Sequence, residues 1–253
     1  MSAAQNVSLP AVEAAPSQSS IRTRILIALT VVTVVLVAFG LYLALGYAPT
    51  EAAQGEVQRI FYIHLSAFAG AFIAFSATVV GGILYLRTRN VKWDTLALAG
   101  VEVGIALALM NLLTGMIWAR PIWNTWWTWD PRLTSEAIMI LTYAAYLMLR
   151  NGIENPEQKR RFVAVYGILA MTTVIAVLII TRIRPDTIHP VVIGPSPQNA
   201  EGGFEMSQRI GMTIGINSFI WSIFVPLTLI WWRIRLENIA ERVRSLKMQV
   251  MGN

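Results

Sequence analysis

Long apolar runs separated by short polar segments dominate this chain. The first run, 25–45, has 21 residues and no charge, which corresponds to about 31 Å of α-helix, enough to cross a bilayer and longer than the core of a signal peptide. Further runs predict spans near 60–86, 95–118, 133–149, 162–181 and 210–232. The pattern therefore predicts an all-α polytopic membrane protein with six transmembrane helices.

The polar ends of the chain differ from this central part. Residues 1–20 are rich in Ala, Ser, Gln and Pro, a composition typical of a flexible tail. The membrane domain is expected over 21–233, with a kink at Pro226 in its last helix. The basic segment 234–253 is partly amphipathic, and we expect it to lie along the cytoplasmic membrane surface.

The positions of lysine and arginine predict the orientation, because cytoplasmic loops are enriched in both. One side of the membrane receives fourteen of them: Arg22, Arg24, Arg87, Arg89, Lys92, Arg150, Lys159, Arg160, Arg161, Arg233, Arg235, Arg242, Arg244 and Lys247. The other side receives six: Arg59, Arg120, Arg132, Arg182, Arg184 and Arg209. This difference places both termini in the cytoplasm and loops 46–59, 119–132 and 182–209 outside.

Composition supports the membrane assignment and excludes several functions. Hydrophobic residues make up 55% of the chain and charged residues 13%, against about 25% charged in soluble domains. The net charge is +6, but the basic residues lie at span ends, which argues against nucleic-acid binding. The absence of cysteine excludes disulfides and thiolate metal sites.

Both histidines of the chain fall on the predicted outer face. His64 lies about one turn inside the second span, and His189 lies in the third outer loop. Each taken alone has an ordinary explanation, a hydrogen-bonded helix end for His64 and a solvated loop for His189. Any imidazole chemistry of this chain must use one or both of them, and ligation of a metal would require their neutral form.

The second outer loop is unusually rich in tryptophan, with five of the nine between 118 and 129. A surface-lying helix over 123–130 would place Trp123, Trp126, Trp127 and Asp130 on one face. That arrangement forms an aromatic shelf suited to a flat, apolar ligand. The alternative is an aromatic belt at the headgroup level.

The run Trp123-Asn-Thr-Trp-Trp-Thr-Trp-Asp-Pro-Arg-Leu-Thr-Ser135 resembles the WWD motif of haem-handling membrane proteins. Within that superfamily, the six spans, length and histidine count resemble the haem exporter protein C (CcmC) family of system I cytochrome c maturation. The segment from Tyr47 through Gln54-Gly55 to His64 is similar to the stretch before that family's first haem-ligating histidine. The family usually has glycine at the position of Asn124.

This resemblance implies haem binding at the extracytoplasmic face of the bacterial inner membrane. Haem b would be bound transiently by His64 and His189 and contacted by the tryptophan motif, which includes Trp129. The family's arginines at the positions of Arg59 and Arg132 belong to the haem site. Arg120 is a further candidate for a propionate, although a headgroup contact would explain it equally well.

The resemblance also implies partners. They are the periplasmic haem chaperone (CcmE), which takes haem covalently, the ATPase and membrane subunits of an ABC transporter, and a small single-span subunit. The chain itself is expected to deliver haem rather than to catalyse a reaction.

Two other functions stay open. One is a haem lyase of the same superfamily, although lyases are usually longer and richer in histidine. The other is an electron-transfer subunit with a buried b-type haem, which would need both ligands on helices. Glu102, inside the third span, is expected to be protonated or bonded to a neighbouring helix.

Overall fold

The computed structural model describes residues 18–191 and 194–251, and this part of the chain is helical and contains no β-strand. Its long helices are α1 (Gln18–Tyr42), α2 (Ile60–Thr88), α3 (Val91–Trp123), α4 (Pro131–Gly152), α5 (Pro156–Ile183) and α6 (Gln208–Met251). A π-helical turn, η1 (Leu43–Tyr47), extends α1, and a 3-10 turn, η2 (Glu56–Arg59), precedes α2. Each predicted span coincides with one of these helices, so the all-α prediction is confirmed.

The starts of three helices are determined by local sequence. Asn90, Asp130 and Asn155 each accept a hydrogen bond from a backbone N–H of the first turn that follows, which is the usual role of an N-cap residue. Proline is the first residue of both α4 and α5, where its missing N–H costs nothing. The connections after α2 and α4 are consequently short, and consecutive helices run antiparallel.

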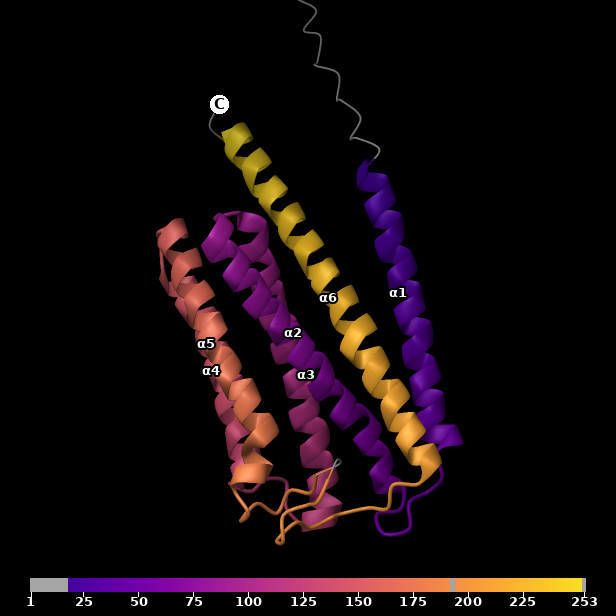
Figure 1. Cartoon of the computed structure of the whole chain (residues 1–253). Helices are drawn as coiled ribbons and strands as arrows, with labels where there is room; N and C mark the ends of the chain where they lie inside the picture. The colour runs from indigo at the N-terminus through magenta and orange to yellow at the C-terminus, as the bar shows by residue number, and fades with distance from the viewer. Residues whose placement is uncertain (1–17, 192–193, 252–253) are drawn as a thin grey trace, which may run out of the picture.

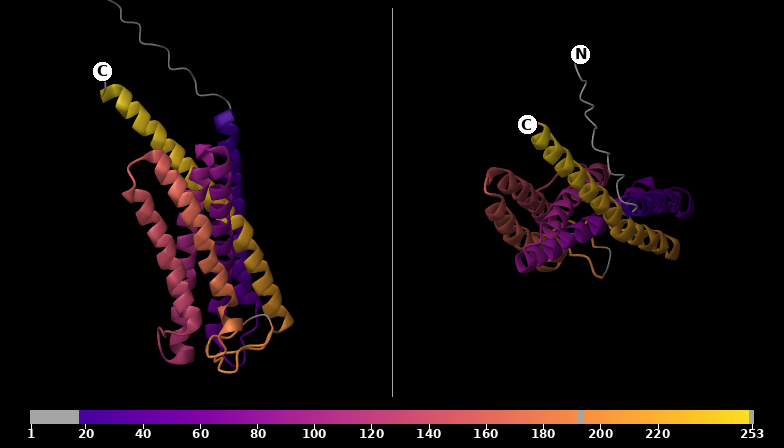
Figure 2. Two further views of the ribbon diagram at one scale, coloured as in Figure 1. Left: turned by 60° about the vertical axis from the view of Figure 1, so that its left-hand side comes forward. Right: turned by 90° about the horizontal axis from the view of Figure 1, so that it is seen from above.

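The helices form a row of pairs rather than a closed ring. In Figure 1 the α4–α5 pair, the α2–α3 pair, α6 and α1 follow one another across the bundle. The turned views in Figure 2 show the same grouping, in which α2 packs against α3, α5 and α6, while α1 packs against α6. The beginning of α1 and the end of α6 lie at one end of the bundle, and the long loops gather at the other.

Small residues bring α2 and α3 into close contact. A Cβ added at Gly81 would come within 2.7 Å of the Trp93 carbonyl oxygen, and one added at Gly100 within 2.6 Å of the Ala74 carbonyl oxygen. Backbones can approach this closely only where side chains are small, as at many transmembrane helix interfaces. The closely packed α2–α3 pair therefore forms the centre of the bundle and provides a firm support for the residues that it carries near the loop end.

Five helices are long and apolar enough to cross a membrane by length and composition: α1 with η1, η2 with α2, α3, α5 and α6. α4 has 22 residues, is less apolar, and packs beside α5. Many large apolar side chains of the five helices are exposed, as expected for surfaces that contact lipid.

Two carboxylates of α3 are paired with arginines of neighbouring helices. Glu102 of α3 forms an ion pair with Arg233 of α6, which agrees with the expectation that a neighbouring helix supplies its partner. Arg150 of α4 binds both carboxylate oxygens of Asp94 at 2.8 and 2.7 Å. Such pairing lowers the cost of charge at membrane depth.

The described residues nearest the two ends of the chain belong to α1 and α6. α6 passes Pro226 as one continuous helix and includes most of the predicted extension, 234–253, up to Met251. The predicted tail, 1–20, lies outside the described residues except for 18–20, which begin α1.

Candidate functional site

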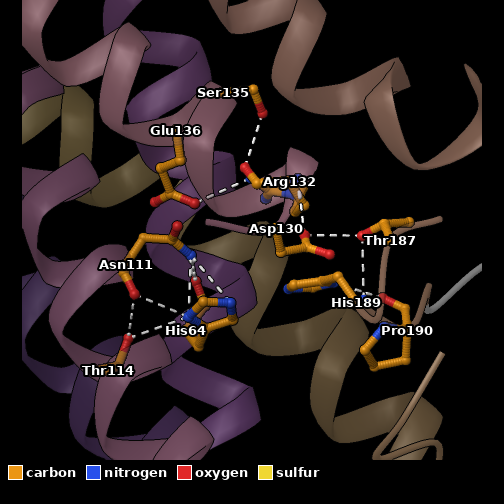
Figure 3. A network of polar contacts seen from close by, with 10 residues as sticks. All are labelled: His64, Asn111, Thr114, Asp130, Arg132, Ser135, Glu136, Thr187, His189 and Pro190. Atoms are coloured by element: carbon orange, nitrogen blue, oxygen red, sulfur yellow. Dashed lines mark hydrogen bonds and ion pairs between the residues drawn. The ribbon is translucent and has the colours of Figure 1, made fainter. Parts of the chain in front are cut away.

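His64 lies in the second turn of α2 and is held by α3. Its Nδ1 is 2.9 Å from the backbone carbonyl oxygen of Asn111 and 3.3 Å from Thr114 Oγ1 (Figure 3). A carbonyl only accepts hydrogen bonds, so Nδ1 carries the proton and Nε2 keeps its lone pair. The Asn111 amide nitrogen donates to the His64 carbonyl oxygen at 2.7 Å, and the two helices therefore fix the ring from both sides.

His189 lies in the long loop between α5 and α6. Its Nδ1 donates to the carbonyl oxygen of Pro190 at 2.8 Å, which again leaves Nε2 with a lone pair. Burial, the positive charge of Arg132 and the His64 ring lower the pKa of His189 to about 3, although the bond to Pro190 acts in the opposite direction. The ring is therefore neutral at physiological pH, the state in which imidazole binds a metal.

The fold brings the two histidines, far apart in the sequence, to one small cavity of about 20 Å³. Aromatic side chains surround it: Phe61, Trp118 and Trp123 line the same cavity. The Trp123 ring meets the His189 ring edge-on, with 5.9 Å between centroids. The predicted proximity of His64 and His189 is thus present in the structure.

This cavity has room for about one water molecule, whereas sites for drug-sized ligands measure about 300–1,000 Å³. A second cavity of about 310 Å³ adjoins it on the other side of His189 and is lined by Leu65, Phe68 and Arg132, among others. The donor set suits an iron porphyrin, since two neutral imidazoles with the lone pair on Nε2 and aromatic faces are present. The cavity between the histidines would accommodate a porphyrin only if the loop that carries His189 moved outward.

Asp130 fixes this loop to the tryptophan motif. Its carboxylate accepts hydrogen bonds from the Thr187 hydroxyl and the Ile188 N–H, each at 2.8 Å. It also caps α4 by accepting from the Arg132 N–H at 2.8 Å. Asp130 is buried and does not line the cavity between the histidines, so its observed contacts position His189.

Arg132 is the predicted arginine that lies at the site. Its Nη1 is 3.0 Å from Glu136 Oε2, and its guanidinium lies over the Phe68 ring at 5.2 Å from the centroid. Glu136 is buried beside the histidine cavity, and its Oε1 has no hydrogen-bond partner among the described residues. The pair places a positive charge next to His189 with a buried carboxylate behind it.

The predicted helix over 123–130 is wrong. α3 ends at Trp123, Asn124 adopts a left-handed conformation with φ of 56°, and the chain is non-helical until Pro131. Trp123 therefore lies with Trp118 beside the histidines, at 5.0 Å between ring centroids. Trp126 and Trp129 are exposed, and Trp127 packs edge-on against Trp129. The motif thus has an inner aromatic group and an outer one.

Arg59 and Arg120 lie apart from both cavities. Arg59 donates to the carbonyl oxygens of Ala44 and Ala48 at 2.6 and 3.2 Å and pairs with Glu56. Arg120 donates to the backbone and side-chain oxygens of Asn124, at 2.7 and 2.5 Å. In this conformation both arginines stabilise the ends of helices.

Sequence analysis missed the residues that join the outer loops. Glu51 is buried and accepts hydrogen bonds from the N–H groups of Ala53, Gln54 and Glu205. Burial alone would raise its pKa, but these backbone bonds outweigh burial and lower it. Gln54 accepts from Trp118 Nε1 at 2.8 Å and donates to the Gly202 carbonyl at 2.5 Å.

These bonds connect the first and third loops to the cavity wall. The available signal for them was weak: Gln54 appears in the segment that resembles the family, while nothing in the sequence singles out Glu51.

Comparison with known proteins identifies the family. The sequence model described as Heme exporter protein C matches residues 11–248. The chain belongs to this family. It is 31% identical over 234 residues to the Heme exporter protein C of Bradyrhizobium diazoefficiens, which covers 90% of this chain and 84% of that protein.

Two further relatives match shorter segments. The Heme exporter protein C of Escherichia coli K12 is 30% identical over 153 residues, 60% of this chain and 61% of that protein. A putative cytochrome c biosynthesis ccmC-like mitochondrial protein of Arabidopsis thaliana is 38% identical over 112 residues, 44% of each chain.

Membership in the heme exporter protein C family makes Asn124 informative. The resemblance described above implies glycine there, and the structure gives this residue a positive φ of 56°. Glycine adopts such a conformation without strain, and asparagine is among the residues that tolerate it best. The departure from the pattern therefore preserves the turn that ends α3.

Proposed function

We propose that this protein binds haem at the loop end of its helical bundle and delivers it for cytochrome c maturation. The observation that supports this most directly is the shared geometry of the two histidines. Each donates Nδ1–H to a backbone carbonyl, so the lone pair lies on Nε2 in each ring, and both rings line one cavity; at His64 the Asn111 amide nitrogen lies 3.5 Å from that Nε2. A hydrogen bond of this kind on the far nitrogen is typical of metal-ligating histidines.

Haem b would be bound transiently, with His64 and His189 as the axial ligands. The rigid α2–α3 pair would present His64 in a fixed position, while the loop with His189 would open and then close over the porphyrin. Arg132 is placed to pair with a propionate, and Glu136 behind it would keep its guanidinium oriented. Trp123 would contact the ring edge next to His189.

The outer part of the tryptophan motif has a different role in this proposal. Trp126, Trp127 and Trp129 would cover the exposed side of the bound porphyrin and form the surface on which the acceptor docks. Asp130 would act through the loop rather than through haem. Arg59 and Arg120 would reach a propionate only when the loops rearrange around the ligand.

The acceptor would be the periplasmic haem chaperone, which would take haem from the opened loop onto its own histidine. The protein would span the bacterial inner membrane several times, with both termini in the cytoplasm and the haem site in the periplasm. It would act in a complex with the ATPase and membrane subunits of an ABC transporter and a small single-span subunit. In this scheme the chain positions haem and catalyses no reaction itself.

Substitution of each axial ligand tests the proposal. Haem-loaded wild-type protein should show a six-coordinate, low-spin spectrum. His64→Gly and His189→Gly should each lose haem or change its spin state, and added imidazole should partly restore the signal by filling the open position. The His64 variant should lose more haem, because that ring lies on a packed helix. Gln198→Gly, in the same loop as His189 and away from both cavities, is the control.

Unchanged spectra in both histidine variants would end the proposal, since the chain has no other histidine. Loading of the purified haem chaperone distinguishes the delivery function from its alternatives. Attachment of haem to apocytochrome thiols without the chaperone would indicate a lyase. Reversible reduction by quinone with no transfer of haem would indicate an electron-transfer subunit.

A further inference from the structure

The end of α6 carries an apolar stripe that no part of the described chain covers. Its members follow one another at alternating spacings of three and four residues and are between 47% and 77% exposed: Leu236, Ile239, Val243, Leu246 and Val250. This spacing is the heptad pattern by which one α-helix packs against another. We propose that the stripe, residues 236–250, docks an acidic amphipathic helix of a partner protein.

The direction of α6 favours a protein partner over the membrane surface. The helix has 44 residues and contains no glycine or proline after Pro226, so nothing in its sequence bends it into the membrane plane. The 19 residues after Trp232 extend it by about 28 Å at 1.5 Å per residue. Figure 1 shows this part projecting beyond the ends of α2 to α5.

The charged residues beside the stripe indicate which kind of partner helix it would bind. Arg235 and Arg242 flank one edge of the stripe, and Lys247 flanks the other, by their positions on a regular helix. Within the described residues, Arg242 and Lys247 form no ion pair. In a two-helix coiled coil these flanking positions meet the corresponding positions of the partner. A partner with Glu or Asp beside its apolar seam therefore matches this surface.

The same charges argue against a second copy of this chain. A parallel pair would place Arg242 of one copy next to Lys247 of the other, and an antiparallel pair would also bring like charges together. The acidic residues of this part of α6 do not compensate, because Glu237 is bound to Arg233 and Arg244, and both Glu237 and Glu241 lie away from the stripe by their positions on a regular helix. The inference is independent of the haem site, which lies at the opposite end of the bundle.

A designed peptide tests the surface on the full chain in phosphatidylcholine nanodiscs. The probe has leucine at every a and d position and glutamate at every e and g position, and the control peptide has lysine at e and g. Fluorescence anisotropy should show the acidic peptide binding at least tenfold more tightly, with affinity falling as salt rises. Val243→Asp should abolish binding. Ser245→Asp, the same charge change on the opposite face, should leave it intact.

Reversal of two surface charges tests the proposal through a gain of binding, which a misfolded variant would not show. The Arg242→Glu, Lys247→Glu double variant should lose the acidic peptide and gain the basic one. Equal binding of both peptides, or no binding of either, would overturn the inference.

Crosslinking in native membranes tests the natural partner. A benzophenone side chain at Val243 should attach to a protein whose crosslinked peptide belongs to an acidic amphipathic helix, and one at Ser245 should not. Crosslinks from Val243 to lipid alone would assign the stripe to the membrane surface. Crosslinks to a second copy would assign it to self-association, and either result would refute the proposal.

Discussion

The Asp130 carboxylate and the Thr187 hydroxyl, 57 residues apart in sequence, form a buried hydrogen bond of 2.8 Å. This bond joins the residue that closes the tryptophan motif to the loop that holds His189. Through it, the motif is joined to the loop that carries His189, and Asp130 bonds to the neighbouring Thr187 and Ile188. Asp130 is thus a structural link between the segment after α3 and the loop after α5.

Removal of this link should free the loop. Asp130→Asn keeps one acceptor oxygen but replaces the other with an NH2 group, which would face hydrogen-bond donors. We therefore expect the free energy that holds the loop in place to fall by about 1–3 kcal/mol. Hydrogen exchange at the Ile188 N–H should become faster, and haem retention should fall. Thr187→Val should have a smaller effect in the same direction. Asp186→Asn, an exposed residue paired with Arg184, is the control, and equal exchange rates in Asp130→Asn and wild type would contradict the assignment.

The outer tryptophans should matter for transfer. Trp126→Ala combined with Trp127→Ala removes two large aromatic faces, each worth about 1–3 kcal/mol of packing. We expect weaker haem retention, slower loading of the chaperone, or both, measured by absorption spectra and by haem staining of the acceptor. A double variant that is produced at the normal level and that retains and transfers haem like wild type would show that this outer group is only an interfacial belt.

The orientation can be tested because the chain lacks cysteine. Asn124→Cys places a thiol on the exposed turn after α3, and Ser245→Cys places one on exposed α6 at the other end of the bundle. In intact cells with a permeable outer membrane, an impermeant thiol reagent should label the first variant and spare the second. Labelling of Ser245→Cys alone would invert the proposed topology.

Glu51 should make the loop assembly sensitive to acid. Its pKa is lowered from an ordinary value of 4.5, so the stabilisation is complete above that value and is lost as the pH falls through the lower, folded value. Hydrogen-exchange protection of residues 51–55 and 202–205, corrected for intrinsic rates, should decrease in this acidic range. In Glu51→Gln the protection should already be reduced at pH 7 and should change less with pH. An unaltered pH dependence in that variant would assign the effect to another group.

The sequence predicted the helices well because each depends on a local pattern. The distribution of arginine and lysine predicts that the end of the span near His64 and the loop with His189 lie on the same side of the membrane. The structure brings both rings to one cavity. The error at 123–130 was also local. Asp130-Pro131 is a helix start signal, and proline disfavours helical backbone in the residue that precedes it. The pair therefore favours a new helix from Pro131 rather than a helix that continues through 123–130.

The contacts between loops could not be predicted in the same way. Thr187 and Glu51 are ordinary polar residues until the fold brings them to distant backbone groups. Arg59 and Arg120 illustrate the opposite case, since their charge suggested a ligand, while the structure shows each bound to nearby carbonyl oxygens. Residues that act through long-range hydrogen bonds leave no periodic signal in the sequence.

The small volume between the histidines has a kinetic consequence. In the proposed function, a porphyrin that enters and one that leaves would pass through the same opened arrangement of the His189 loop, so a factor that eases opening would accelerate both passages by the same ratio. The loop can therefore set the speed of exchange but not its direction. A net flow of haem from this protein to the proposed acceptor would then have to be driven by the acceptor, through tighter or covalent attachment on the receiving side.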